Sequence, residues 1–330
     1  MINILSMGNF LYGAPSLQLN TKLWNLLLQR YVSVKNVANK FKISERQLYK
    51  WKELVNNYPL NIINVLVKDV GLNLDNNLIY IKTKRASEPL NNPKIYYILN
   101  EDIAEFFGHL LHDGGIDLQY GVHYTTHSQI FADRFKYLVK ICFGEITARE
   151  YKKQNKVIVY YPSILGIIIT TLFRFKKGNK VKNNVTIPNF IVQNNDEKIL
   201  WKYLVAAYGC DGSKDRVSIV SASSIIDKPS NLTKDLYNIF RKLNFISVKI
   251  RLLNVYKLKD GDIHSGWVVQ ITDKKEKNFF LLVYHNYLQT IISTSKDREW
   301  SARAKAGLTV SYTVRDAERK LWSSEPLCPP

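Results

Sequence analysis

The sequence predicts an α+β protein in which one order of helices and strands occurs twice, preceded by a small N-terminal helical domain. Residues 101–297 contain a weak internal repeat of about 98 residues. Residues 21–60 have the apolar spacing of two short helices joined by a tight turn. Hydrophobic residues make up 46% of the 330 residues and aromatic residues 12%, which is enough to form two or three cores.

The N-terminal domain is predicted to span residues 1–95 and to contain a helix-turn-helix pattern. Residues 34–41 have helical apolar spacing, and Ser44 with Gln47 forms a capping box that starts a second helix. The second helix presents Arg46 and Lys50 outward, where DNA lies in helix-turn-helix proteins. The alternative is an ordinary packed helical hairpin. The hydrophilic stretch 82–94 is predicted to be a linker.

The repeat defines two halves, residues 96–188 and 189–297. Each half opens with a helix ending in Asp-Gly, at Asp113 and at Asp211, and continues with strands, a helix, strands and a closing helix. Arg149 follows Asp113 by 36 residues and Lys249 follows Asp211 by 38, so two similar halves about a pseudo-twofold axis are expected. Residues 298–330 differ in composition and form a C-terminal tail to which no function is assigned.

The two Asp-Gly helix ends are the strongest indication of chemistry. Small residues precede them, namely Gly108, Ala206, Ala207 and Gly209. Small residues allow two helices to approach closely, which would bring Asp113 and Asp211 to one edge of the interface. Two carboxylates at the negative ends of helix dipoles repel each other unless a divalent cation neutralises them, and oxygen ligands suit Mg²⁺. The alternative is an ordinary Asp-Gly turn ending each helix.

Residues 106–114 (FFGHLLHDG) and 204–212 (LVAAYGCDG) resemble the two motifs of a LAGLIDADG homing endonuclease of the single-chain, double-motif kind familiar from archaeal introns. Residues 187–191 (IPNFI) resemble the lead-in to the second motif. The resemblance implies two αββαββα halves whose saddle-shaped antiparallel sheets lie in the DNA major groove. It also implies an intron-encoded monomer that cleaves both strands at a long site by Mg²⁺-dependent phosphodiester hydrolysis.

The resemblance also implies the site residues. Asp113 and Asp211, with the glycines that follow them, Gly114 and Gly212, match the metal positions for two or more Mg²⁺ ions, for which Mn²⁺ can substitute. Lys214 matches a basic residue near the active centre, and His127 is a looser match in the first half. Each would stabilise charge on the phosphate or tune the attacking water.

The exposed strand faces are expected to read DNA. In residues 247–252, alternation places Lys249 and Arg251 on one face and Val248, Ile250 and Leu252 on the other. In the next strand Trp267, Val269 and Ile271 are expected in the core, with Gln270 opposite. The predicted DNA-binding residues of the two halves are Gln119, Arg149, Tyr151, Lys152, Lys153, Arg216, Lys249, Arg251 and Gln270.

The charge agrees with a nucleic-acid partner, because 47 Lys and Arg stand against 28 Asp and Glu, a formal charge of +19. We expect double-stranded DNA as the partner, with intron RNA as a second one. No apolar run is long enough for a membrane span, and the first residues lack a signal peptide, so an intracellular, non-secreted protein is expected. Two alternatives remain: a non-cutting relative acting as an RNA splicing maturase, or a DNA-binding transcriptional regulator.

Overall fold

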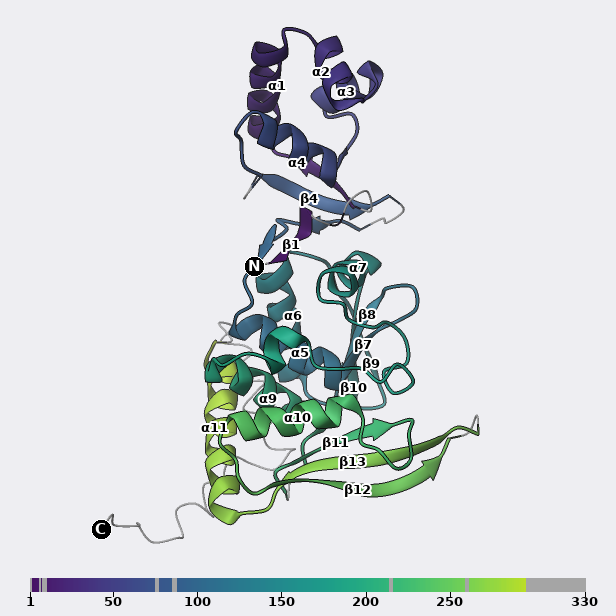
Figure 1. The fold of residues 1–330 in the computed structure, drawn as a ribbon, viewed down its shortest axis with the longest axis vertical. Helices are drawn as coiled ribbons and strands as arrows, with labels where there is room; N and C mark the ends of the chain where they lie inside the picture. Colours follow the sequence, from purple (N-terminus) through teal and green to yellow (C-terminus); the bar gives the residue numbers. More distant parts are fainter. Residues whose placement is uncertain are drawn as a thin grey trace, which may run out of the picture.

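The computed structural model describes residues 2–5, 7, 11–74, 77–84, 88–213, 216–258 and 261–294. The tail predicted at 298–330 lies outside the described residues. Figure 1 shows an elongated molecule with the N-terminal part at one end, the first half in the middle and the second half at the other end. Within the described ranges, no helix is both long and apolar enough to cross a membrane.

The N-terminal part contains a sheet as well as the predicted helices. Its helices are α1 (Leu17–Tyr31), α2 (Val34–Phe41), α3 (Glu45–Lys52) and α4 (Leu60–Asp69). Its sheet has the order β3-β2-β4-β5, formed by β2 (Leu11–Pro15), β3 (Tyr58–Pro59), β4 (Leu78–Thr83) and β5 (Leu90–Asn91). The purely helical domain was therefore the wrong expectation, because these strands are short and widely separated in the sequence.

The turn between α2 and α3 is short and is followed by a capped helix start, as the pattern of two short helices predicts. Lys42 adopts the left-handed conformation (φ 54°, ψ 45°), and the Ser44 hydroxyl accepts a hydrogen bond from the Gln47 amide at 3.3 Å. Trp51 is buried and stacks on Tyr58 with ring centroids 5.1 Å apart. These contacts fix the orientation of α3 against the rest of the N-terminal part.

The first half has the predicted αββαββα order. Its elements are α5 (Glu101–His112), β7 (Gly114–Ile116), β8 (Val122–Thr126), α6 (Gln129–Phe143), β9 (Arg149–Lys153), β10 (Lys156–Tyr161) and α7 (Ser163–Leu172). The four strands form one antiparallel sheet in the order β7-β8-β10-β9. Val157, Val159 and Tyr161 of β10 are buried, which identifies the core-facing side of the sheet.

The second half repeats this order with one difference. After the short α8 (Asn189–Val192) come α9 (Glu197–Asp211), β11 (Ser218–Ser223), α10 (Asn231–Lys242), β12 (Val248–Lys257), β13 (Ile263–Ile271) and α11 (Lys274–Thr294). The sheet order β11-β13-β12 corresponds to β8-β10-β9. Among the described residues, a single bridge from Gly212 to Ile219 stands where β7 lies in the first half. The mixed α+β fold of two related halves is thus confirmed.

Helices α5 and α9 lie side by side between the halves, as Figure 1 shows. Their closest approach is at Gly108, where an added Cβ atom would lie 2.7 Å from the Ala206 Cβ atom and 2.7 Å from the Tyr203 carbonyl oxygen. A residue without a side chain is therefore required at this crossing, as the small-residue pattern predicted. The crossing brings the C-terminal ends of both helices together.

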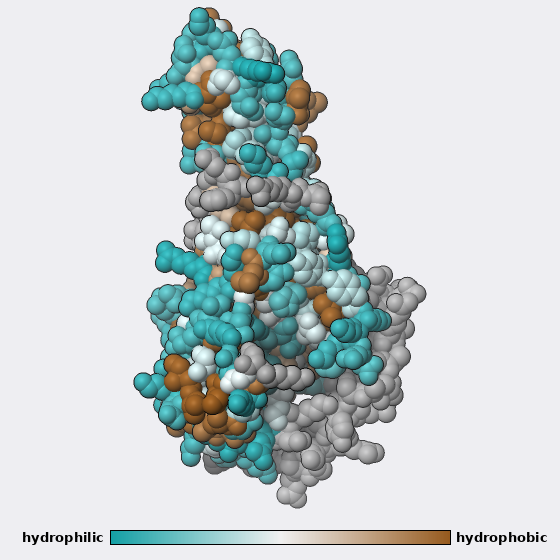
Figure 2. All heavy atoms as spheres, turned by 90° about the vertical axis from the view of Figure 1, so that its right-hand side faces the viewer, coloured by the Kyte–Doolittle hydropathy of each residue, from teal (hydrophilic) through white to brown (hydrophobic). Residues whose placement is uncertain are grey.

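The surface also has an apolar end. Figure 2 looks toward the tip of the β12–β13 hairpin and shows hydrophobic side chains gathered at the end of the molecule away from the N-terminal part. Exposed hydrophobic residues of these two strands are Leu252, Leu253, Val255 and Ile263. Leu252, expected on the same face as Val248 and Ile250, is exposed, and a register shift between Leu252 and Asn254 interrupts the pairing of β12 with β13 just after it.

Candidate functional site

The structure brings the two predicted aspartates to one place. Asp113 caps the C-terminal end of α5, and Asp211 is the last residue of α9. Burial and then the charge of Asp211 raise the pKa of Asp113 to about 6, against the opposing effects of the Cys210 thiol, His112 and Lys180. The two carboxylates are close enough to interact at the seam between the halves, in a partly dehydrated environment.

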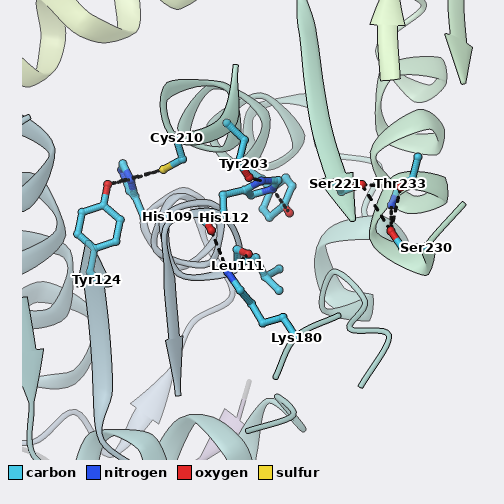
Figure 3. A network of polar contacts seen from close by, with 11 residues as sticks. His109, Leu111, His112, Tyr124, Lys180, Tyr203, Cys210, Ser221, Ser230 and Thr233 are labelled. Atoms are coloured by element: carbon cyan, nitrogen blue, oxygen red, sulfur yellow. Dashed lines mark hydrogen bonds and ion pairs between the residues drawn. The ribbon is translucent and has the colours of Figure 1, made fainter. Parts of the chain in front are cut away.

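His112 orients the carboxylate of Asp211 across this seam. Its Nδ1 atom lies 2.7 Å from Oδ2 of Asp211, and its Nε2 atom lies 3.2 Å from the Tyr203 hydroxyl. Because a carboxylate only accepts, the Nδ1–H donates to Asp211, and in a neutral ring Nε2 accepts from Tyr203. Figure 3 shows the His112 and Tyr203 side chains together at the crossing of the two helices. A residue of the first motif thus positions the acid of the second motif.

Lys180 supplies a positive charge that the sequence analysis missed. It belongs to the segment between the halves, and its Nζ atom donates to the carbonyl oxygens of Leu111 and His112, both at 2.8 Å. Burial lowers the pKa of Lys180, while the charges of Asp211 and Asp113 act to raise it. Figure 3 shows the side chain reaching the end of α5. Lys180 lies in a lysine-rich stretch, and nothing in the sequence distinguishes it from Lys176, Lys177 and Lys182.

A cavity of about 220 Å³ adjoins this group of residues. Lys180, Asp211 and His112 line one part of it, and Ser221 and Ser230 of the second half line another. The hydroxyls of Ser221 and Ser230 both contact Thr233, as Figure 3 shows. The space next to Asp211 is therefore polar and open enough to admit water.

The remaining predicted catalytic and metal residues are less central. Lys214 lies outside the described residues. His127 is exposed, and its Nδ1 atom lies 3.2 Å from the Asn155 carbonyl oxygen in the β9–β10 turn. Gly114 begins β7, and a Cβ atom there would lie 2.9 Å from the His123 carbonyl oxygen. At Gly212 a Cβ atom would lie 2.2 Å from the Tyr208 carbonyl oxygen, so both glycines are explained by close backbone contacts and their metal role stays a prediction.

The register of the first sheet divides the predicted DNA-binding residues of β9 between its two faces. Arg149 pairs with Tyr160, and Tyr151 pairs with Ile158, so these residues lie opposite the core-facing side of β10. Lys152 pairs with the buried Val157 and therefore lies on the other face, although its own side chain is exposed, and its contact with DNA stays a prediction. The face opposite the core comprises Arg149, Tyr151, Lys153, Ile158, Tyr160, His123 and Thr125. Gln119 is exposed in the turn before β8.

The second sheet keeps two of its predicted basic positions. Lys249 and Arg251 are exposed and pair with Gln270 and Val268 of β13. Gln270 is only 9% exposed, because β13 is the central strand and neighbours flank it on both sides, and its contact with DNA stays a prediction. Val269 and Ile271 are buried as expected, whereas Trp267 is only partly buried.

The other predicted DNA-binding side chains are accessible. Arg216 is exposed just before β11. In the N-terminal part, Arg46 is exposed on α3 and Lys50 is partly exposed. Accessibility is what DNA contact requires, and the contacts themselves stay predictions.

A buried polar network behind the carboxylates was also missed. Glu105 of α5 accepts two hydrogen bonds from Arg134 of α6, at 2.6 and 2.7 Å, and one from the Tyr287 hydroxyl of α11 at 3.0 Å. Burial acts to raise the pKa of Glu105, but the hydrogen bonds and charge of Arg134 hold it below its ordinary value. The network ties the last helix of the second half to the first half.

The network continues to His109 and Cys210. Nε2 of His109 lies 3.3 Å from the Tyr287 hydroxyl, and Nδ1 lies 3.1 Å from the Tyr124 hydroxyl and 3.5 Å from Sγ of Cys210. Burial lowers the pKa of His109 to about 4, so its ring is neutral near pH 7. Because Tyr287 donates to Glu105, its oxygen accepts from Nε2–H of His109, which leaves Nδ1 as an acceptor. Cys210 in turn hydrogen-bonds Asp113.

The donor set fits a hard divalent cation held jointly with a substrate. Among the described residues, no group of three or more His, Cys, Asp and Glu side chains could form a closed metal cage. Mg²⁺ is commonly bound by one or two carboxylates together with water and substrate phosphates. The two aspartates, of which Asp211 lines a partly polar cavity, match that mode and do not match a structural zinc site.

No family model matches the chain, and no curated protein matches it. Among solved structures, mesophilic variants of the homing endonuclease I-DmoI match with 16% identity and a TM-score of 0.38, covering 56% of this chain and 96% of that one. I-DmoI in complex with DNA and Ca matches with 14% identity and a TM-score of 0.35, covering 63% and 98%. At TM-scores this low the likeness carries no argument about function.

Proposed function

We propose that the chain is a metal-dependent DNA endonuclease of the LAGLIDADG homing type that cleaves both strands of a long site. The observation that carries this proposal is the meeting of Asp113 and Asp211 at the ends of two closely crossed helices, where burial and mutual repulsion raise the pKa of Asp113 to about 6. Such a pair is electrostatically unfavourable unless a cation joins it. The resemblance of residues 106–114 and 204–212 to the two LAGLIDADG motifs supports phosphodiester hydrolysis as the reaction.

In this proposal Asp113 and Asp211 hold the divalent ions, Mg²⁺ in the cell and Mn²⁺ as a substitute. When bound, these ions lower the pKa of an attacking water and stabilise the leaving 3′ oxygen. His112 holds the Asp211 carboxylate in one orientation through its 2.7 Å hydrogen bond. Lys180 places a fixed positive charge beside both acids and stabilises charge on the phosphate, the role predicted for Lys214.

The two sheets hold the duplex in the proposed complex. Their accessible faces carry Arg149, Tyr151 and Lys153 in the first half and Lys249 and Arg251 in the second. Arginine can donate two hydrogen bonds to guanine in the major groove, and lysine neutralises phosphates. A monomer with two related halves presents one such face to each side of the cleavage centre.

The test uses Asp113→Asn and Asp211→Asn in the full chain. Duplexes are first selected by binding from a random-sequence library, and cleavage is then followed with Mg²⁺, with Mn²⁺ and with a chelator. We expect the wild type to linearise plasmids carrying a selected site only with the metal, and both variants to bind with little loss while cutting at least a hundredfold more slowly. Binding without any cutting by the wild type would instead support a DNA-binding regulator, and preferential binding of structured RNA would support a maturase.

Lys180 gives a second test with a matched control from the same segment. Lys177 also donates to a backbone carbonyl, that of Leu118 at 3.0 Å, and lies over the Tyr120 ring. We expect Lys180→Met to slow the single-turnover cleavage rate by about 10²–10³-fold while the dissociation constant for DNA changes little. Lys177→Met is expected to leave the rate near that of the wild type, and equal rates for the two variants would contradict the role of Lys180.

A further inference from the structure

The N-terminal part is joined to the first half by two passes of the chain. On the first pass, β1 (Ile2–Asn3) pairs with β6 (Tyr96–Tyr97), and the Ile4 amide donates to the Ile95 carbonyl oxygen at 3.0 Å, before the chain enters the N-terminal sheet at β2. On the second pass, the chain leaves the sheet through β5 and returns through residues 92–97. Two adjacent passes resist bending and twisting more than a single tether would.

The returning pass is docked on the first half. The Asn91 amide donates to the Glu145 carbonyl oxygen at 2.7 Å, and the Glu145 amide donates back at 2.8 Å. The Lys94 amide donates to the Phe143 carbonyl oxygen at 3.0 Å. Gly144, at φ +126°, lies so near that a Cβ atom would be 2.7 Å from the Asn91 carbonyl oxygen. Residues 88–94 of the stretch predicted as a linker, together with residues 95–97, therefore form an ordered connection.

The docked segment also shares the core of the first half. Tyr97 is 1% exposed and packs against Phe143 and Phe173, with ring centroids 5.5 and 5.8 Å apart. At the start of the connection, Glu88 accepts a hydrogen bond from Arg149, which begins β9, at 3.1 Å. The connection therefore contacts both the core and the first strand of the proposed DNA-reading face.

The helix-turn-helix segment at the far end of this connection is strongly basic. Its only acidic residue between Ser33 and Lys52 is Glu45, and its basic residues are Lys35, Lys40, Lys42, Arg46, Lys50 and Lys52. The Asn20 side chain donates to the Lys52 carbonyl oxygen at 2.8 Å, which fixes the C-terminal end of α3. A fixed helix with exposed basic side chains is complementary to the backbone and groove of a duplex.

We propose that the N-terminal part and the first half form one rigid DNA-reading unit, in which α3 contacts the same duplex at a fixed distance and helical phase on the first-half side of the cleavage centre. The inference rests on the proposed function, because it takes the first-half sheet to be bound to DNA. The inference adds to the proposed function a second DNA-binding surface on α3 and places it on the first-half side of the cleavage centre. It also predicts a fixed spacing between the two DNA segments that are bound.

The consequence of a fixed spacing follows from duplex geometry. Five inserted base pairs move the flank by about 17 Å and rotate it by about half a turn, whereas ten pairs restore the phase and leave a shift of about 34 Å. A flexible tether would tolerate ten inserted pairs. The ordered connection of residues 88–97 predicts that five and ten inserted pairs both remove the contribution of the N-terminal part.

The test uses the full chain and duplexes selected by it from a random-sequence library. Each duplex is prepared intact, without the flank, and with five or ten base pairs inserted between flank and centre. We expect the intact duplex to bind at least tenfold more tightly than the other three. The double variant Arg46→Ala with Lys50→Ala should lose this advantage and bind the intact and flankless duplexes equally. Lys68→Ala, which removes an exposed lysine of α4, should retain it.

The outcomes separate this proposal from the proposed function. Equal affinity for the intact and flankless duplexes, with normal cleavage of both, would overturn the rigid-unit proposal and leave the nuclease intact. Recovery of full affinity with ten inserted pairs would overturn the rigidity. Failure to cut any duplex would overturn the proposed function, while a footprint over the flank that disappears in the double variant would still support the second surface.

Discussion

Replacing Asp113 by asparagine is expected to stabilise the metal-free protein while abolishing its activity. Burial and the Asp211 charge raise the pKa of Asp113 from its ordinary value of 3.8 to about 6. The folded state therefore binds the Asp113 proton more tightly than the unfolded state does. By linkage, this group's contribution to stability falls as the pH rises from about 4 to about 6, and above that range it is fully unfavourable.

The size of the effect follows from the same values. The difference between about 6 and 3.8 corresponds to about 3 kcal/mol, because each pKa unit is worth about 1.4 kcal/mol. Asparagine has the shape of aspartate without its charge, so Asp113→Asn is expected to recover about 2–3 kcal/mol at pH 7.5 and almost nothing at pH 4. In a chain of this size that gain raises the Tm by several degrees.

Scanning calorimetry in a chelating buffer between pH 4 and 8 measures this difference. Asp117 provides the control carboxylate, because it accepts hydrogen bonds from the Gln119 and Gly121 amides and from the Tyr160 hydroxyl. Asp117→Asn should therefore destabilise the protein. Added Mg²⁺ should raise the Tm of the wild type and not that of Asp113→Asn. An Asp113→Asn protein that is less stable than the wild type at pH 7.5 would refute the account of the paired carboxylates.

Two further predictions concern the packing around this centre. Gly108→Ala should lower the free energy of unfolding by about 1–3 kcal/mol in urea. The reason is that the new methyl group would meet the Ala206 Cβ atom at 2.7 Å and force α5 and α9 apart. An unchanged urea midpoint would contradict the close crossing of the two helices. Glu105→Gln should destabilise by about 3–5 kcal/mol, because it leaves the buried Arg134 without its countercharge. Glu145→Gln, which breaks the exposed pair with Lys140, should change little, and equal losses for the two glutamates would contradict the buried network.

Much of the two halves could be predicted because local signals agree with the tertiary fold. The apolar residues of the helix Gln129–Phe143 recur with helical spacing, and those of the strand Lys156–Tyr161 alternate, so each sequence agrees with its structure. The strand β7 follows only from the element order that the family resemblance implies, because it is three residues long and contains two glycines. The N-terminal sheet could not be predicted either, because β3 and β5 have only two residues each. Segments this short show no alternation in the sequence, and they pair with strands that are distant along the chain.

Only those residues of the candidate site that belong to the two helix-ending Asp-Gly motifs could be predicted from the sequence. Asp113 and Asp211 were found because each ends a helix with the same small-residue pattern, and the crossing at Gly108 brings them together. Lys180 was not found, because its role depends on where the segment between the halves folds back onto the end of α5. The face on which Lys152 lies could not be predicted, because the phase of β9 is set by its pairing with β10 and not by its own five residues, which are all exposed.

A crystal structure of the full chain with a selected duplex and Mn²⁺ tests the proposed metal site most directly, because the anomalous signal of manganese locates the ions. We expect anomalous peaks between the two DNA strands, within bonding distance of carboxylate oxygens of both Asp113 and Asp211 and of phosphate oxygens of the DNA. Peaks that contact neither aspartate, or a duplex that lies away from the seam between α5 and α9, would contradict the proposed site.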